Sequence, residues 1–322
     1  MSGFPEEITV DILKRLPIKS VLKFRCVCKK WYDILNDPEF LKKQQNHDLG
    51  DDDSTLILRK GCDYYSISND TFTSIASSSS SDVAISLSAK DVKDLDFPII
   101  SPKTPMPFIE ETVQVLGSCK GLICFVLVFA RIHGLLNPFT GEYRKLPSPG
   151  SSIPSGKSLF YNYGLGYDSK TSDYKLVRIA KSDENVPEVK VYTVGSNSWR
   201  SIENLDIPYV SCRGTSRFLN GCLHWIANYS FQTPRVIVSF DLGSETFKEL
   251  ALPENLRGGS NVCFSAAGGC LTVLCSDPCP WGRFDVWVMK DYGRRESWTR
   301  LFTITENIKS FEYIIRSFRH LR

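Results

Sequence analysis

Hydrophobic and polar positions alternate with one periodicity before residue 50 and with another after it. In residues 1–47, apolar residues recur at the spacing of short amphipathic helices. From residue 54 onward, β-branched and aromatic residues form short runs separated by Gly, Pro, Asn, Asp and Ser, as in strands joined by turns. The stretch 48–53 has one glycine and four acidic residues, which indicates a solvated linker. The sequence therefore predicts an α+β multidomain chain with a helical head at 1–47, an acidic linker at 48–53 and an all-β domain at 54–322.

The head is predicted to contain three short helices. The first begins near Pro5, carries an apolar stripe that starts at Ile8, and ends at Pro17. The second extends from about Lys19 to Asp37, and the third follows it directly. So small a unit has too little interior to bury all of its apolar side chains. Part of the apolar surface of the head is therefore expected to contact a partner.

The β domain repeats a pattern of a strand, a polar turn and an anchoring aromatic residue. The anchoring aromatics, at intervals of 71, 56, 48 and 51 residues, are Phe72, Tyr143, Trp199, Phe247 and Trp298. Three of these hairpins are preceded by glycine-led strands, which begin at Lys120-Gly121, Asn220-Gly221 and Gly268-Gly269. A period near ~50 residues with such strands is typical of a kelch-like β-propeller. The alternative is a twisted β-sandwich whose single core holds the same aromatics.

Composition narrows the class of protein. Among 322 residues, 42% are hydrophobic and 23% charged, as in ordinary soluble globular proteins. The net charge of +3 lies in the head, because residues 1–47 hold nine Lys/Arg and six Asp/Glu while the remainder holds 30 of each. A broad basic field for nucleic acid is therefore not expected. Eleven scattered cysteines, no secretory signal and no apolar run of membrane-spanning length predict free thiols and a location in the cytoplasm and/or nucleus.

Three stretches have a superficial likeness to ligand-binding motifs. The stretch 150–158 has five residues between its glycines where a phosphate loop needs four, and it includes a proline that removes one N–H. Gly164-Leu165-Gly166 opens no helix and is interpreted as a strand that needs close backbone approach. Cys275 and Cys279 have no His pair nearby, and His224 is interpreted as a packed core or rim residue. No catalytic residue, metal or cofactor is predicted.

Residues 3–47 resemble the F-box in its plant form. The resemblance rests on Phe4-Pro5-Glu6-Glu7, Ile12-Leu13-Lys14-Arg15-Leu16-Pro17 and Phe24-Arg25-Cys26-Val27-Cys28-Lys29-Lys30-Trp31. Modules of this family dock on a Skp-type adaptor, which joins a cullin scaffold in an SCF ubiquitin ligase. The resemblance implies adaptor contacts at Phe4, Pro5, Ile8, Ile12, Leu13, Leu16, Pro17, Leu22, Val27, Cys28 and Trp31. A head that only caps the next domain is the alternative.

Residues 110–303 resemble the plant F-box-associated domain of type 1. The motifs are Ser118-Cys119-Lys120-Gly121-Leu122, Asn137-Pro138-Phe139-Thr140-Gly141-Glu142, Gly164-Leu165-Gly166-Tyr167-Asp168, Asn220-Gly221-Cys222-Leu223-His224-Trp225 and Ser297-Trp298. The resemblance implies that this domain binds a target protein, and Phe231, Trp281 and Arg283 are candidate contacts because aromatics and Arg commonly anchor interfaces. Members of the family usually continue with further strands, whereas this chain stops soon after Phe302. The propeller is therefore expected to be incomplete at its C-terminus, and the sequence leaves open whether its ring of sheets closes.

The two resemblances together predict the substrate-recognition subunit of an SCF-type ubiquitin ligase. Such a subunit is a non-catalytic adaptor that presents a target for ubiquitination and degradation by holding it near other subunits. Its predicted partners are a Skp-type adaptor, a cullin scaffold through that adaptor and an unidentified target protein, without nucleic acid or membrane. Two alternatives stay open: a carbohydrate- or small-ligand-binding or enzymatic propeller with a regulatory head, and a truncated, non-productive F-box protein.

Overall fold

The structure is a computed structural model of the whole chain. The residues that the structure describes are 5–14, 24, 27–36, 40, 55–60, 63–68, 93–94, 113–128, 130–138, 141–150, 159–182, 187–203, 211–228, 235–254, 261–267, 269–276, 284–304 and 320–321. The predicted linker 48–53 lies outside these residues, so the division at that point stays a prediction. None of the described helices is long and apolar enough to cross a membrane.

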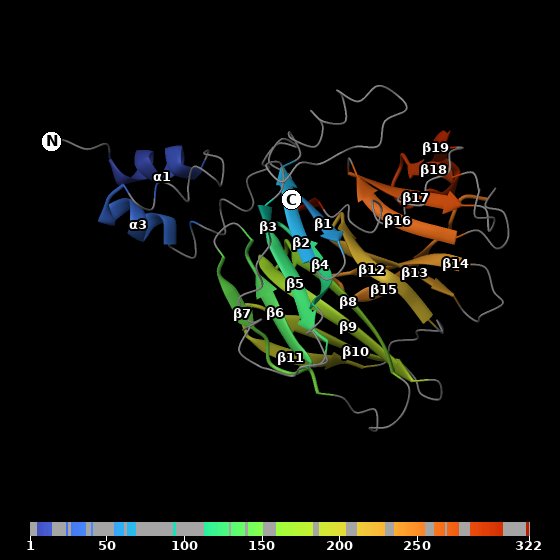
Figure 1. The fold of residues 1–322 in the computed structure, drawn as a ribbon, viewed down its shortest axis with the longest axis horizontal. Helices are drawn as coiled ribbons and strands as arrows, with labels where there is room; N and C mark the ends of the chain where they lie inside the picture. Colours follow the sequence, from blue (N-terminus) through green and yellow to red (C-terminus); the bar gives the residue numbers. More distant parts are fainter. Residues whose placement is uncertain are drawn as a thin grey trace.

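The described strands form five four-stranded antiparallel sheets (Figure 1). The first sheet has the order β20 (His320–Leu321), β1 (Thr55–Lys60), β2 (Asp63–Ser68), β3 (Lys93–Asp94). The second contains β4 (Val113–Cys119), β5 (Leu122–Leu127), β6 (Ile132–Leu136) and β7 (Tyr143–Lys145). The third contains β8 (Leu159–Asp168), β9 (Asp173–Ser182), β10 (Glu188–Thr193) and β11 (Ser198–Ile202). The fourth contains β12 (Ser211–Leu219), β13 (Cys222–Asn228), β14 (Arg235–Asp241) and β15 (Thr246–Leu250), and the fifth β16 (Asn261–Ala267), β17 (Cys270–Ser276), β18 (Phe284–Met289) and β19 (Trp298–Ile304).

The first strands of neighbouring sheets lie against one another, so β4 contacts β8 and β8 contacts β12. Glycines allow this approach: a Cβ added at Gly164 would lie 2.7 Å from Ser216 Oγ, and one added at Gly166 would lie 2.6 Å from Phe218 Cδ2. Because positions 164 and 166 match 216 and 218 in order, β8 and β12 run in the same direction. The predicted role of the two glycines, close backbone approach in a strand, is confirmed.

The described anchoring aromatics lie on the fourth strands, and two of them connect neighbouring sheets. Trp199 Nε1 donates to the Pro147 carbonyl oxygen at 2.8 Å, and Trp298 Nε1 donates to the Ala251 carbonyl oxygen at 2.9 Å. In both cases the acceptor belongs to the segment that leaves the preceding sheet. Trp199 and Trp298 therefore each join their own sheet to the preceding one, while Phe72 lies outside the described residues.

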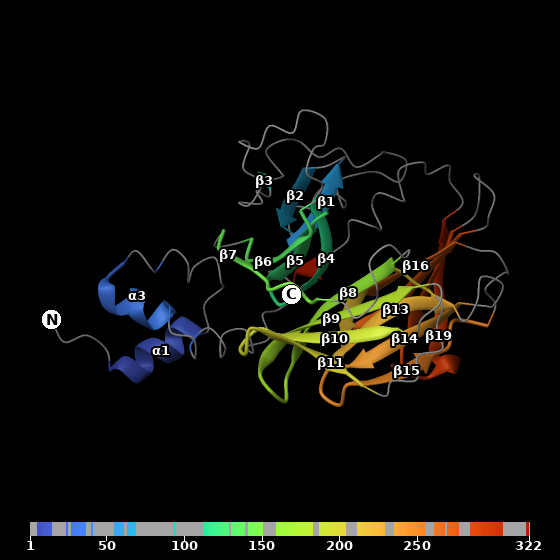
Figure 2. The ribbon, with the colours of Figure 1, turned by 90° about the horizontal axis from the view of Figure 1, so that it is seen from below.

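Two apolar clusters fill the spaces on either side of the third sheet. The cluster shared with the fourth sheet contains Val177, Val191, Leu223, Trp225 and Phe240, all fully buried. The cluster shared with the second sheet contains Leu116, Cys124, Leu165, Leu176 and Tyr192. Burying each large side chain contributes about 1.5–3 kcal/mol. Figure 2 shows the second, third and fourth sheets as successive layers of strands, the arrangement of a propeller-like domain. The predicted propeller is confirmed, and the β-sandwich, which needs two facing sheets, is wrong.

The first and last described strands meet in one sheet. Thr55 and Leu56 of β1 pair with Leu321 and His320 of β20. Beside them, β20 also contacts β4 of the second sheet. We expected the propeller to lack strands at its C-terminus. In this sheet β20 supplies one of four described strands, so the sheet is not short of a strand.

The described head contains helices α1 (Glu6–Lys14) and α3 (Lys29–Asn36), coloured blue in Figure 1. The predicted uninterrupted helix from Lys19 to Asp37 is wrong, because residues 27 and 28 are not helical. The Tyr32 N–H donates to the Cys28 carbonyl at 2.9 Å, so a new helix begins after Cys28. The residues Cys26-Val27-Cys28 are poor helix formers, which favours a break there.

Candidate functional site

The head holds a small core of its own. Leu13 on α1 and Leu35 on α3 are fully buried, and Phe40 is 3% exposed. Phe24 and Trp31 pack against them and contact each other edge to face, with ring centroids 5.4 Å apart. Edge-to-face pairs contribute about 0.5–1.5 kcal/mol beyond the area that they bury. The two helices are therefore held together by apolar packing from both sides.

Outside this core, the head exposes several large apolar side chains. Ile8 and Ile12 are 48% and 49% exposed, and they lie on the same side of α1 because they are four residues apart. Val27, in the turn before α3, is 58% exposed, and Tyr32 on α3 is 54% exposed. We call Ile8, Ile12, Val27 and Tyr32 the exposed apolar set. Several exposed apolar side chains within so small a unit are typical of an interaction surface.

The residues predicted for adaptor contact differ in how exposed they are. Pro5, Ile8, Ile12, Val27 and Cys28 are exposed, Trp31 is half-buried and Leu13 is buried. Phe4, Leu16, Pro17 and Leu22 lie outside the described residues, as do the predicted target contacts Phe231, Trp281 and Arg283. Tyr32 was not among the residues predicted for adaptor contact. Its position in the sequence could have indicated it, because Tyr32 follows the predicted contact Cys28 by four residues, near the start of a helix. Leu13 belongs to the core of the head, and its direct contact with an adaptor stays a prediction.

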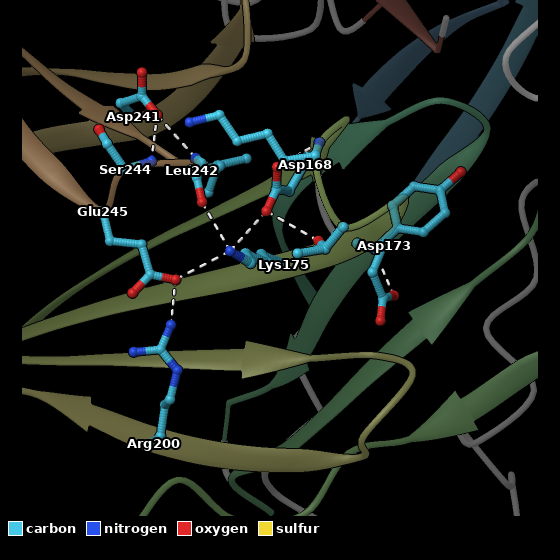
Figure 3. A network of polar contacts seen from close by, with 12 residues as sticks. Asp168, Asp173, Lys175, Arg200, Asp241, Leu242, Ser244 and Glu245 are labelled. Carbon is cyan, nitrogen blue, oxygen red and sulfur yellow. Dashed lines mark hydrogen bonds and ion pairs between the residues drawn. The ribbon is translucent and has the colours of Figure 1, made fainter.

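A network of charges joins the third and fourth sheets (Figure 3). The ammonium of Lys175 on β9 lies 2.8 Å from Asp168 Oδ2, 3.0 Å from Glu245 Oε1 and 2.7 Å from the Leu242 carbonyl oxygen. The Lys175 side chain is 7% exposed and that of Asp168 2%. Arg200 on β11 forms a further ion pair with Glu245. The network was not predicted, since Lys175 and Glu245 are 70 residues apart in the sequence.

Every charge in the network has partners that favour its ionised form. Burial opposes the ionisation of Asp168, but hydrogen bonds from Lys175, Thr171 and the Lys170 amide together lower its pKa. Burial likewise opposes ionisation of Glu245, and its bonds to Arg200 and Lys175 lower its pKa. The same contacts raise the pKa of Lys175 against the effect of its burial. Because each group is paired and charged at neutral pH, the network joins two sheets and is not poised to exchange protons.

His133 and His224 of the β domain each pack against aromatic side chains. His133 Nε2 lies 2.8 Å from the Tyr163 hydroxyl, and His224 Nε2 lies 2.7 Å from the Tyr292 hydroxyl. Burial lowers the pKa of each histidine to about 4, so both are neutral at pH 7. The prediction that His224 is a packed core or rim residue is confirmed. Among the described residues, no group of His, Cys, Asp and Glu is placed to hold a metal ion.

The fold and the head together define a class: a propeller-like β domain behind a small helical interaction module. Family models assign both parts. The F-box domain matches residues 1–43, and the F-box associated beta propeller domain matches residues 67–319. The chain therefore belongs to the F-box proteins that carry an F-box-associated β-propeller domain. The predicted family is confirmed at this level.

Individual relatives agree with this assignment. The chain is 30% identical to the F-box protein CPR1 of Arabidopsis thaliana, over 98% of this chain and 76% of that protein. It is also 30% identical to the Arabidopsis thaliana F-box/kelch-repeat protein At3g23880, over 94% of this chain and 79% of that protein. Among solved structures, TolB from Acinetobacter baumannii matches 77% of this chain and 52% of its own at 10% identity, with a TM-score of 0.42.

Proposed function

We propose that this protein is the substrate-recognition subunit of an SCF-type ubiquitin ligase. The observation that carries the proposal is the exposed apolar set on the head, which lies outside the described core formed by Leu13, Leu35 and Phe40. Ile8, Ile12 and Val27 are about half exposed or more, so they can contact a partner, and for an F-box that partner is a Skp-type adaptor with a cullin scaffold behind it.

The proposed mechanism is proximity, with no catalytic residue in this chain. The head joins the ligase and the β domain holds a target protein, so a lysine of the target stays near the loaded conjugating enzyme. Holding reactants together raises their effective concentration without any new chemical group. The protein would act in the cytoplasm, the nucleus or both.

The strand directions indicate which side of the β domain holds the target. Since β8 and β12 run in the same direction, their first residues, Leu159 and Ser211, lie at the same face of the domain. In an antiparallel sheet the second strand ends and the third begins at that face, so Asn228 and Arg235 lie there as well. The opposite face has shorter turns, such as 120–121 and 220–221. We propose that the face at which β8 and β12 begin, where the longer connections join the strands in the sequence, binds the target, and Phe231 stays a predicted contact.

Adaptor binding is tested with an Ile12→Asp variant of the full-length protein and a purified Skp-type adaptor, by calorimetry. A charge in place of a half-exposed interface side chain should weaken binding about 30-fold or more, the effect of losing one interface hot spot. Because Ile12 is not part of the head core, the helices should still form, and circular dichroism checks this.

The matched control is Leu301→Asp, which makes the same chemical change at a residue of β19 that is 54% exposed. It should bind the adaptor as the wild type does. Unchanged adaptor affinity for Ile12→Asp would show that the exposed apolar set is not the docking surface. Loss of target degradation with Ile12→Asp, but not with Leu301→Asp, would connect docking to function.

A further inference from the structure

A second charged cluster lies on the other face of the third sheet. Arg178 on β9 and Lys190 on β10 stand directly opposite each other in the strand register. Arg178 Nη1 donates to the Gly150 carbonyl oxygen at 2.6 Å and lies 3.4 Å from Glu188 Oε2. Lys190 Nζ donates to the Pro149 carbonyl oxygen at 3.0 Å and lies 3.3 Å from Glu188 Oε1. Two cations therefore share one carboxylate and two neutral carbonyl oxygens.

This cluster carries an excess of one positive charge among the residues that form it. The neighbouring His133 adds no charge at pH 7, because burial, helped by Arg178, holds its pKa at about 4. The Arg178 side chain is only 3% exposed, and its buried Nε has no hydrogen-bond partner in the described part of the chain. Like charges directly opposite each other destabilise a sheet, and buried charge without full compensation is costly. Within the described part of the chain, the two cations are therefore matched by a single carboxylate.

We propose that Arg178 and Lys190 bind the carboxylate of an acidic side chain in the target protein, in place of the carbonyl oxygens of Pro149 and Gly150. The inference rests on the proposed function, since it assigns a target chemistry to the face of the domain at which β8 begins. A carboxylate carries the single negative charge that the cluster lacks, whereas a phosphate monoester carries about −1.5 to −2 at pH 7. Hydrogen bonds to an ionised acceptor are roughly twice as strong as those to a neutral one, which favours the exchange.

The surroundings of the two cations suit a bound protein segment. The ring of Tyr161 lies over the Arg178 guanidinium, with 4.8 Å between the ring centroid and Cζ, and Tyr161 is 45% exposed. An exposed aromatic beside an arginine is a common anchor of protein interfaces. The acidic side chain would therefore arrive with an apolar neighbour that packs on the Tyr161 ring.

Residues 146–150 cover the cations, and the first two of them are held by other parts of the fold. The Leu146 N–H donates to the His133 carbonyl at 2.9 Å, and Pro147 accepts from Trp199, so these two residues are held by the neighbouring strands. By contrast, the carbonyl oxygens of Pro149 and Gly150 accept hydrogen bonds from Lys190 and Arg178. Gly150 has φ +60°, and glycine adopts positive and negative φ with little penalty. A change of backbone after Pro147 would release both carbonyls without disturbing the core.

The test uses full-length protein and three randomised peptide libraries with one fixed residue: Glu, Gln or phosphoserine. Capture of each library is measured for the wild type, Lys190→Met and Glu188→Gln, with Lys248→Met, at an exposed position on β15, as the matched control. The wild type and the control should capture the Glu library about tenfold better than the Gln library, the value of one charge-assisted contact.

The variants separate binding from a structural role. Lys190→Met should remove the preference for Glu, whereas Glu188→Gln, which deletes the competing carboxylate, should strengthen it. A purely structural cluster would not give opposite changes. Equal capture of Glu and Gln by the wild type, or a preference for phosphoserine, would overturn the inference. Adaptor binding is measured on the same preparations: if the adaptor binds and the Glu preference is missing, only this inference fails, and if the adaptor does not bind, the proposed function fails.

Discussion

Replacing Lys175 with methionine is the sharpest test of how the third and fourth sheets are joined. The ammonium of Lys175 contacts Asp168, Glu245 and the Leu242 carbonyl within 3.0 Å, and the Lys175 side chain is 7% exposed. Methionine has a similar length and remains apolar along its stem, so the packing of the stem is kept and the charge is lost. The substitution leaves the Asp168 carboxylate, which is 2% exposed, without its cation.

Removing one partner of a buried ion pair destabilises a protein by about 3–5 kcal/mol. The lower end applies here, because Asp168 keeps the Thr171 hydroxyl and the Lys170 N–H, each at 2.9 Å, and Glu245 keeps Arg200. We therefore expect Lys175→Met to lower the free energy of unfolding by about 3 kcal/mol. In the double variant with Asp168→Asn, the loss should be smaller than the sum of the two single losses, since the second change removes the orphaned charge.

The assay is guanidinium unfolding of the full-length protein, followed by tryptophan fluorescence, which reports on the β domain through Trp225 and Trp298. Lys170→Met is the matched control, because Lys170 is exposed in the adjacent turn and its loss should change stability by no more than about 0.5 kcal/mol. If the free energy of unfolding of Lys175→Met lies within about 1 kcal/mol of the wild-type value, the ion pairs do not hold the sheets together.

Three further predictions concern the same domain. The pKa values of Asp168 and Glu245 are lowered by folding, so their contribution to the free energy of unfolding is present above about pH 4 and is lost as the pH falls below it. In acid titrations followed by circular dichroism, the stability of Lys175→Met should therefore depend less steeply on pH than that of the wild type. Gly166→Ala should lower the free energy of unfolding by about 1–3 kcal/mol in denaturant titrations, because the added Cβ would lie 2.5 Å from a side-chain carbon of the fourth sheet; unchanged stability would contradict the close approach of β8 and β12. Trp298→Phe keeps an aromatic ring but loses the indole N–H that donates to Ala251 and part of the buried ring system, so calorimetric unfolding should show a loss of about 1–3 kcal/mol, and a loss below about 0.5 kcal/mol would contradict its role in joining the two sheets.

Local sequence patterns predicted the hairpins, because the residues that form them are close together in the chain. The aromatic of each described hairpin pairs with the end of the strand before it, as Phe247 does with Phe240 and Trp199 with Tyr192. Turn chemistry was equally local: the Asn220-Gly221 turn has φ values of +50° and +74°, which Asn and Gly adopt more readily than other residues. The break at Cys28 was missed, since helical periodicity continues across it and only the backbone shows where α3 begins.

Order in the chain was sufficient to identify a helical head, a series of β hairpins and the family to which both belong, since each of these depends on neighbouring residues. The exposure of Ile12 beside a buried Leu13 depended on how α1 and α3 pack, which adjacent positions of one helix do not reveal. The meeting of Lys175 with Glu245, and of Arg178 with Gly150, depended on the stacking of separate sheets. Such contacts bring together residues 28 to 70 positions apart, and no local pattern encodes which sheet faces which.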